Sequence, residues 1–143
     1  VQMGTPEELF ETPAHTFVGY FIGSPGMNLL RAEVEGQRAR IGGGEIALGG
    51  AYPALDGKVE IGVRPEFVRL SASGEGLPVQ VLRIEDVGRH RIVRADCAGT
   101  PLNVIVREGE EIGADASRVT FDPGRVNVYR NDWRVAPIHR EAA

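Results

Sequence analysis

The stretch TPEELFETPAHTFVGYFIGSPGMN, at residues 5–28, decides how the rest of the chain is interpreted. Thr5 is a suitable N-cap residue, and Glu8 follows three positions later, so the two complete a capping box at the start of a helix. Pro13 ends that helix, because the residue before a proline is disfavoured in the α conformation. We therefore expect a short helix before Pro13.

A second short helix is expected from Thr16 to Ile22, ended by Gly23. Aromatic and aliphatic side chains leave it almost no polar face, which is typical of a helix that is buried against its own domain or a partner. The aromatic residues expected to make that contact are Phe17, Tyr20 and Phe21.

After Asn28 the sequence changes to strand-like alternation, interrupted by glycine and proline. The expected strands cover 30–35, 37–41, 45–48, 58–63, 67–70, 77–87, 91–95, 101–107, 118–122 and 126–129. Gly36 is expected to end the first strand, a loop is expected over 49–57, and residues 122–124 (Asp-Pro-Gly) are expected to turn a last hairpin. The residues after Arg130 are expected to form a tail. So many short strands predict a β-barrel or a β-sandwich.

Composition narrows the class of protein. The chain has 143 residues, 42% of them hydrophobic, and a net charge of −4, which is typical of one soluble globular domain. Its 16 Lys and Arg residues are scattered, which argues against a nucleic-acid groove and against a polybasic membrane patch. Cys97 is the only cysteine, so an intrachain disulfide is impossible. The uncharged stretch 12–30 contains several prolines and glycines, which argue against a membrane-spanning helix.

The side chains that most often carry catalysis or bind metals form no recognisable constellation in the sequence. The three histidines are far apart and lack the spacing of metal ligands: His15, His90 and His139. Cys97 follows Asp96, whose charge raises the thiol pKa and so disfavours a nucleophile. Glu85 and Asp86 are adjacent, and adjacent residues of a strand face opposite sides. We therefore expect no catalytic and no metal-binding residue.

Two motifs resemble a known family. The positions of the first are Gln2, Gly4, Thr5, Pro6, Glu8, Leu9, Pro13, Ala14, Phe17, Val18, Phe21, Ile22, Gly23, Ser24, Pro25, Met27 and Asn28. The second is GVRPE at 62–66, and a looser third match covers 121–130. Together they resemble the maltose-type ATP-binding-cassette importer ATPases, in which the first motif joins the ATPase domain to a C-terminal regulatory domain. The resemblance covers nearly the whole chain.

The sequence has no phosphate-binding loop of the form G-x-x-x-x-G-K-[ST]. The three glycines at 42–44 are followed by Glu45, whose charge would repel a phosphate. The resemblance therefore implies that this chain is a non-enzymatic fragment and that the ATPase domain lies upstream of Val1. It also implies that ATP and magnesium belong to the full-length parent, and that the fragment binds no cofactor.

The resemblance also sharpens the expected fold. It implies a mainly β protein, in which an OB-like β-barrel, the transport-associated (TOBE) regulatory domain, is preceded by two short N-terminal helices. Residues 1–25 are expected to be the helical tail of the missing ATPase domain and its linker. Residues 26–134 are expected to form the barrel, and residues 135–143 a flexible tail.

Arg64 and Glu66 are the charged residues of the second motif, and they share one face if their segment is extended. Either they form a structural ion pair that holds a chain turn, or Arg64 holds the chain crossing at 24–28 and couples the barrel to the ATPase helices. The expected interdomain or regulatory residues are Arg64, Pro65, Glu66, Ser24, Pro25, Met27 and Asn28. Those expected to contact a second copy or the ATPase domain are Phe17, Tyr20 and Phe21.

The function implied by the resemblance is that of a regulatory and dimerisation domain of an importer ATPase, which energises the uptake of a sugar, a polyol or a glycerol phosphate. Its expected partners are its own ATPase domain, a second copy, and the permease subunits reached through the ATPase domain. Its expected location is the cytoplasm, at the inner face of the cell membrane. The sequence does not identify the solute.

The alternative is a binding module that senses a small ligand, an oxyanion or a sugar, as related barrels of molybdate-type importers do. Such a site needs converging N–H groups and a fixed cation, and the arginines considered for this role are Arg64, Arg83 and Arg89.

Overall fold

The structure is a computed structural model that describes residues 14–16, 26–72, 74 and 76–140. Within these residues the chain consists of β-strands and two 3-10 helices, η1 (Pro65–Phe67) and η2 (Pro123–Arg125). The expectation of a mainly β protein is therefore confirmed. The strands of the described part form four separate sheets, so the expected closed barrel is wrong.

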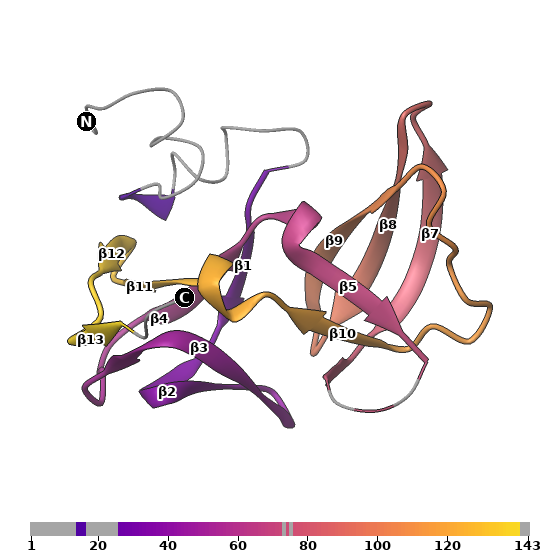
Figure 1. The fold of residues 1–143 in the computed structure, drawn as a ribbon. Helices are drawn as coiled ribbons and strands as arrows, with labels where there is room; N and C mark the ends of the chain where they lie inside the picture. Colours follow the sequence, from indigo (N-terminus) through magenta and orange to yellow (C-terminus); the bar gives the residue numbers. More distant parts are fainter. Residues whose placement is uncertain (1–13, 17–25, 73, 75, 141–143) are drawn as a thin grey trace.

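The first lobe of the molecule contains two of these sheets (Figure 1). In one, β1 (Asn28–Arg31) pairs with β4 (Val59–Val63), β4 pairs with β11 (Asn127–Arg130), and β11 pairs with β12 (Trp133–Val135). All three pairings are antiparallel. The first lobe therefore combines strands from both ends of the described sequence.

The other sheet of the first lobe is built on a long hairpin of β2 (Glu33–Ile41) and β3 (Gly44–Tyr52). The short strand β13 (His139–Arg140) adds to the free side of β3. Gly36 does not end β2, as had been expected; it has a φ of +62° and lies at a bulge where the register with β3 shifts. Strand β3 also continues through the first residues of the expected loop at 49–57.

The second lobe contains the other two sheets (Figure 1). One has the order β5-β10-β6, with β5 at Val68–Ser71, β10 at Arg118–Phe121 and β6 at Leu77–Pro78.

The remaining sheet of the second lobe has the order β7-β8-β9. Its strands are β7 (Gln80–Asp86), β8 (His90–Cys97) and β9 (Thr100–Arg107). A bulge interrupts β7 between Val81 and Arg83, within the strand expected over 77–87.

The expected last hairpin is wrong. Strand β10 pairs with β5 and β6 in the second lobe, whereas β11 pairs with β4 and β12 in the first. The turn between them, η2, carries the chain from one lobe to the other, and the Asp122 side chain accepts a hydrogen bond from Gly124 N there. Beyond Arg130, where a tail had been expected, β12 and β13 pair with β11 and β3.

The core runs through both lobes as one buried cluster. It includes Ile61 and Val128 from the first lobe and Val93, Leu102 and Val119 from the second. The alternation of apolar residues in β4 and β9 places one face of each strand in this cluster, as expected for half-buried strands. The two expected N-terminal helices fall outside the described residues, apart from Thr16 at the start of the second.

Candidate functional site at the strand crossing

The first motif enters the fold at Met27 and Asn28, both of which are buried. Asn28 is the first residue of β1 and pairs with Val63 of β4, the residue before Arg64. The structure therefore brings Met27 and Asn28 of the first motif next to Val63 and Arg64 of the second. We call these four residues the crossing. The remaining predicted residues of the first motif lie outside the described part of the chain: Ser24, Pro25, Phe17, Tyr20 and Phe21.

The Asn28 side chain joins the first lobe to the second. Its Nδ2 donates to the backbone oxygen of Asn103 in β9 at 2.9 Å, and the Asn103 N–H donates to Asn28 Oδ1 at 2.8 Å. The amide thus satisfies both backbone groups of Asn103, as a neighbouring strand would do. Asn28 is only 4% exposed, so these bonds are sheltered from water and would be costly to leave unmade.

Met27 packs into a space that depends on a glycine. The Tyr129 hydroxyl donates to Met27 Sδ at 3.6 Å, and Tyr129 is fully buried. A Cβ on Gly62 would lie 2.7 Å from Met27 Sδ and 2.8 Å from Tyr129 Cε1. Any larger residue there would force Met27 or Tyr129 to shift, because both distances are shorter than real Cβ contacts. Burial raises the pKa of Tyr129 well above its usual range.

Arg64 lies at the end of β4 and is buried, which is rare for an arginine. Burial lowers the pKa of its guanidinium, and the charge of Glu66 and the Tyr129 hydroxyl oppose that effect. Pro65 begins η1, and the Phe67 N–H donates to Arg64 O at 3.0 Å. The segment is therefore a turn and not extended as had been expected, although Glu66 still acts electrostatically on Arg64.

A line of polar contacts leads from the crossing to the far strand of the second lobe. Asn103 Oδ1 accepts from Arg94 Nη1 at 3.0 Å, and Arg94 Nη2 lies 3.1 Å from Glu85 Oε2. Glu85 Oε1 is in turn 3.0 Å from Arg83 Nε. The hydrogen bond from Arg94 lowers the pKa of Glu85. We call the series Asn28, Asn103, Arg94, Glu85 and Arg83 the polar row.

The described N-terminal segment 14–16 docks on β12. The Thr16 N–H donates to Asp132 O at 2.9 Å, and the Arg134 N–H donates to Ala14 O at 2.7 Å. Between them, His15 forms a β-bridge with Trp133, and the two rings meet edge to face at 4.5 Å. This segment therefore contacts the first lobe before the chain reaches the crossing.

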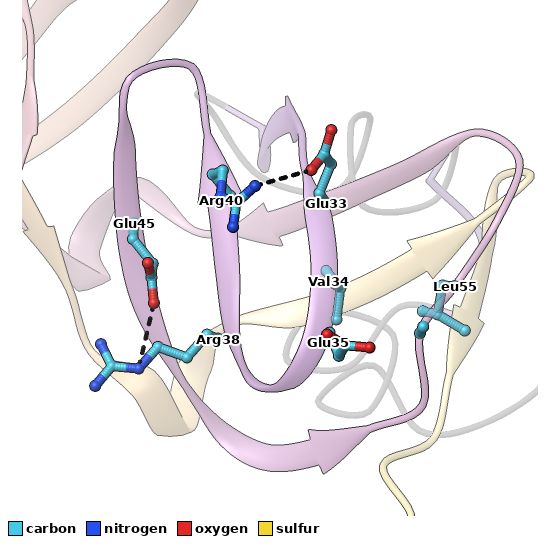
Figure 2. Close-up of a pocket in the computed structure, with 8 residues that line it drawn as sticks. Glu33, Val34, Glu35, Arg38, Arg40, Glu45 and Leu55 are labelled. Carbon is cyan, nitrogen blue, oxygen red and sulfur yellow. Dashed lines mark hydrogen bonds and ion pairs between the residues drawn. The ribbon is translucent and has the colours of Figure 1, made fainter.

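The hairpin β2–β3 carries a charged hollow of about 550 Å³ (Figure 2). Its lining residues are Glu33, Val34, Glu35, Arg38, Arg40, Glu45, Ala54 and Leu55. Arg40 pairs with Glu33 at 3.4 Å and Arg38 with Glu45 at 3.3 Å, and all four side chains are exposed. Exposed ion pairs are solvated and weak, so these two pairs contribute little to stability.

The residues considered for catalysis or ligand binding do not converge. Within the described residues, no three potential metal-ligating side chains form a cluster. Cys97 is buried, and burial together with the charge of Asp96 raises its thiol pKa. Arg64 lies at the crossing, whereas Arg83 pairs with Glu85 on β7 and Arg89 is exposed in the β7–β8 turn, so these three arginines form no common anion site. None of the described helices has the length and apolar character needed to cross a membrane.

Sequence reasoning found Asn28 and Arg64 through the motifs, but it assigned no role to Gly62, although the second motif contains it, and it missed Asn103 and Tyr129. A glycine inside a strand marks a close approach of neighbouring atoms, so Gly62 carried a usable signal. Asn103 and Tyr129 carried none, since their roles depend on which strands meet.

Comparisons with known proteins agree with this geometry. Residues 23–68 match the model of the MalK OB fold domain, and residues 61–128 match that of the TOBE domain. Val63 and Arg64 of the crossing lie where the two matched regions overlap, whereas Met27 and Asn28 lie in the first region alone.

Two curated relatives carry the same name, sn-glycerol-3-phosphate import ATP-binding protein UgpC. The one from Jannaschia sp. (strain CCS1) is 35% identical over 131 residues, which cover 92% of this chain and 37% of the relative. The one from Escherichia coli (strain K12) is 45% identical over 92 residues, or 61% of this chain and 26% of the relative. The matched part of the chain therefore spans 37% of the length of the first relative and 26% of the second.

A solved structure of the cytoplasmic molybdate-binding protein ModG, with molybdate bound, has a TM-score of 0.54 to this chain and covers 72% of it and 95% of the ModG chain. The two are 18% identical, so this likeness shows the fold alone. The family matches go further: the chain belongs to the MalK OB fold and TOBE domain family, and it corresponds to the C-terminal regulatory domain of sugar and glycerol-phosphate ATP-binding-cassette importer ATPases.

Proposed function

We propose that this chain is a non-catalytic regulatory domain that holds two copies of an importer ATPase subunit together, and that the importer takes up a sugar, a polyol or a glycerol phosphate. The names of the relatives support the class of solute, and the family matches support the regulatory role. The observation that carries the proposal is the crossing, where Asn28 bonds both backbone groups of Asn103 in the other lobe.

The crossing makes a mechanical role reasonable. Met27 and Asn28 directly follow the segment expected to come from the ATPase domain, and both are fixed by buried contacts to elements distant in sequence. A pull on that segment would therefore move both lobes together. A tether of this kind keeps two motor domains at high effective concentration while they separate and close.

The other partners follow from the same proposal. ATP and magnesium would bind the ATPase domain of the full-length subunit, and the permease would be contacted through that domain at the inner face of the membrane. Arg64 is proposed to act on the crossing through its buried guanidinium, with Glu66 as a compensating charge.

The test uses the intact subunit reconstituted with its permease. We expect Asn28→Ala to weaken the association of two subunits and to lower solute uptake, while ATP hydrolysis per ATPase domain is retained. Light scattering, uptake and hydrolysis are measured on the same preparations. Hydrolysis of ATP by the present chain alone would overturn the non-catalytic role.

Arg64 is tested separately. If Arg64→Ala left both the melting temperature and the association of subunits unchanged, Arg64 would have no coupling role. A lowered melting temperature with unchanged association would make it a structural residue only.

A further inference from the structure

Strand β7 presents exposed apolar side chains at the edge of a sheet. Leu82 is 62% exposed, Ile84 48%, and Val87, just beyond the strand, 50%. These are large values for residues of this kind, and the three lie on β7 or in the turn between β7 and β8. Figure 1 shows this hairpin in the second lobe. Contiguous exposed apolar residues often mark a contact surface.

The backbone of β7 is also open on one side. Among the described strands, β7 pairs only with β8, so its other edge has no strand partner. An open edge is a template for pairing with another strand. The bulge at Leu82 limits the regular edge to the residues from Arg83 onward.

We propose that the β7 edge pairs antiparallel with β7 of a second copy of this chain, with Ile84 facing Ile84 of the second copy on the twofold axis. The two sheets would then join into one continuous sheet. This inference rests on the proposed function, in which two copies associate, and it assigns the surface through which they do so.

The charges of Arg83 and Glu85 favour a second copy of β7 as the partner strand, and they favour one register of the pairing. With Ile84 on the axis, Arg83 of each copy faces Glu85 of the other, so opposite charges meet twice. A shift that places Arg83 or Glu85 on the axis brings two like charges face to face, which is destabilising in a sheet. The edge is therefore complementary to itself in this register.

Contacts within the polar row hold the side chains of Arg83 and Glu85 in place before any pairing. Arg94 Nε and Nη2 lie 3.3 Å and 3.1 Å from Glu85 Oε2, and Arg83 is held by Glu85 Oε1. Arg94 in turn bonds Asn103, which Asn28 holds at the crossing. The charges at the proposed contact are thus connected through ion pairs and hydrogen bonds to Asn28, where the N-terminal segment enters the fold.

The first experiment measures the mass of this chain by light scattering over a range of concentrations. Arg83→Glu and Glu85→Arg each bring like charges together and are expected to weaken the dimer about tenfold or more. An equal mixture of the two variants puts opposite charges at both positions, so it is expected to recover association as a heterodimer. Arg89→Glu makes the same charge change in the turn outside the paired strand and is expected to have no effect.

The second experiment tests the register without disturbing the Arg94–Glu85 pair. Ile84→Cys places two thiols opposite each other and is expected to give a disulfide-linked dimer on mild oxidation. Leu82→Cys, which faces a different residue, is expected to give much less. Cys97 is buried and does not compete.

The outcomes separate this inference from the proposed function. A dimer that Arg83→Glu and Arg89→Glu affect equally, and that Ile84→Cys does not link, would overturn the β7 contact but leave the tether in place. A chain that stays monomeric throughout would also overturn it, and association of the intact subunit would then decide the tether. Melting curves confirm that each variant is folded.

Discussion

The crossing and the charged hollow of β2–β3 are both polar regions, yet they differ in how their polar groups are satisfied. At the crossing, Asn28 is buried and its amide bonds backbone groups of another strand. In the hollow, the Arg40 and Glu33 side chains are 68% and 82% exposed and bond each other (Figure 2). Water replaces the second kind of contact at little cost, whereas burial of Asn28 shelters the first.

This difference indicates which polar contacts help to determine the fold. The hydrogen bonds of the crossing join lobes that are distant in sequence, so they help to select one arrangement of the chain. The ion pairs of the hollow lie within one hairpin whose register the backbone already sets. Substitutions of similar size should therefore have very different effects in the two regions, and the following predictions test that contrast.

The largest effect is expected for Asn28→Ala. The change leaves the N–H and C=O of Asn103 without their bonds at a part-buried position, so we expect the free energy of unfolding to fall by roughly 2–4 kcal/mol. Denaturant unfolding measures it. Asn28→Asp is the informative control, because it keeps the acceptor but turns a buried carboxylate oxygen toward the Asn103 carbonyl, and it should be at least as destabilising as the alanine variant at neutral pH.

Gly62→Ala is expected to have the next largest effect. Its methyl group would press on Met27 Sδ and Tyr129 Cε1 in the core, and such overpacking typically costs about 1–3 kcal/mol. The matched control is Gly43→Ala in the β2–β3 turn, where no atom lies within 4 Å of the new methyl group. The melting temperatures of the two variants are compared. Equal decreases would show that the crossing is not tightly packed.

Local signals in the sequence predicted much of the fold, and pairing accounts for the errors. The turn at Asp122-Pro123-Gly124 exists, because Pro123 and the Asp122 side chain build it locally. The hairpin inferred from it does not exist, because the flanking strands find better partners in different lobes. Gly36 likewise has the positive φ that suits a turn, but β3 pairs across it and turns it into a bulge.

The sequence likewise predicted the local features of the candidate site but not its long-range contacts. The two motifs identified Asn28 and Arg64, and β4 ends at Val63, before Pro65, because proline has no N–H to donate to a ladder. The bonds that give Asn28 its role depend on Asn103, which lies 75 residues away in sequence. No local pattern distinguishes such a residue from any other polar residue of a strand.

Tyr129→Phe is expected to have a smaller effect, which depends on pH. Near neutral pH the loss should be under about 1 kcal/mol, because the thioether of Met27 is a weak acceptor. Burial raises the pKa of Tyr129, so above about pH 10 the unfolded chain releases its proton while the folded chain keeps it, and stability falls as pH rises. The variant should lose this part of the alkaline decline. Parallel unfolding curves for both chains from pH 9 to about 11 would contradict a buried, neutral phenol.

The smallest effect is expected in the hollow. Arg40→Ala and Glu33→Gln, alone and together, form a double-mutant cycle whose coupling should be below about 0.5 kcal/mol, because both side chains are mostly in water. The coupling should also shrink further as salt is raised from low ionic strength, since mobile ions screen exposed charges. A coupling of 2 kcal/mol or more, which is far outside the range for exposed pairs, would mean that the hollow is held as firmly as the crossing. The hollow would then be a preorganised charged site, and the contrast drawn between the two regions would fail.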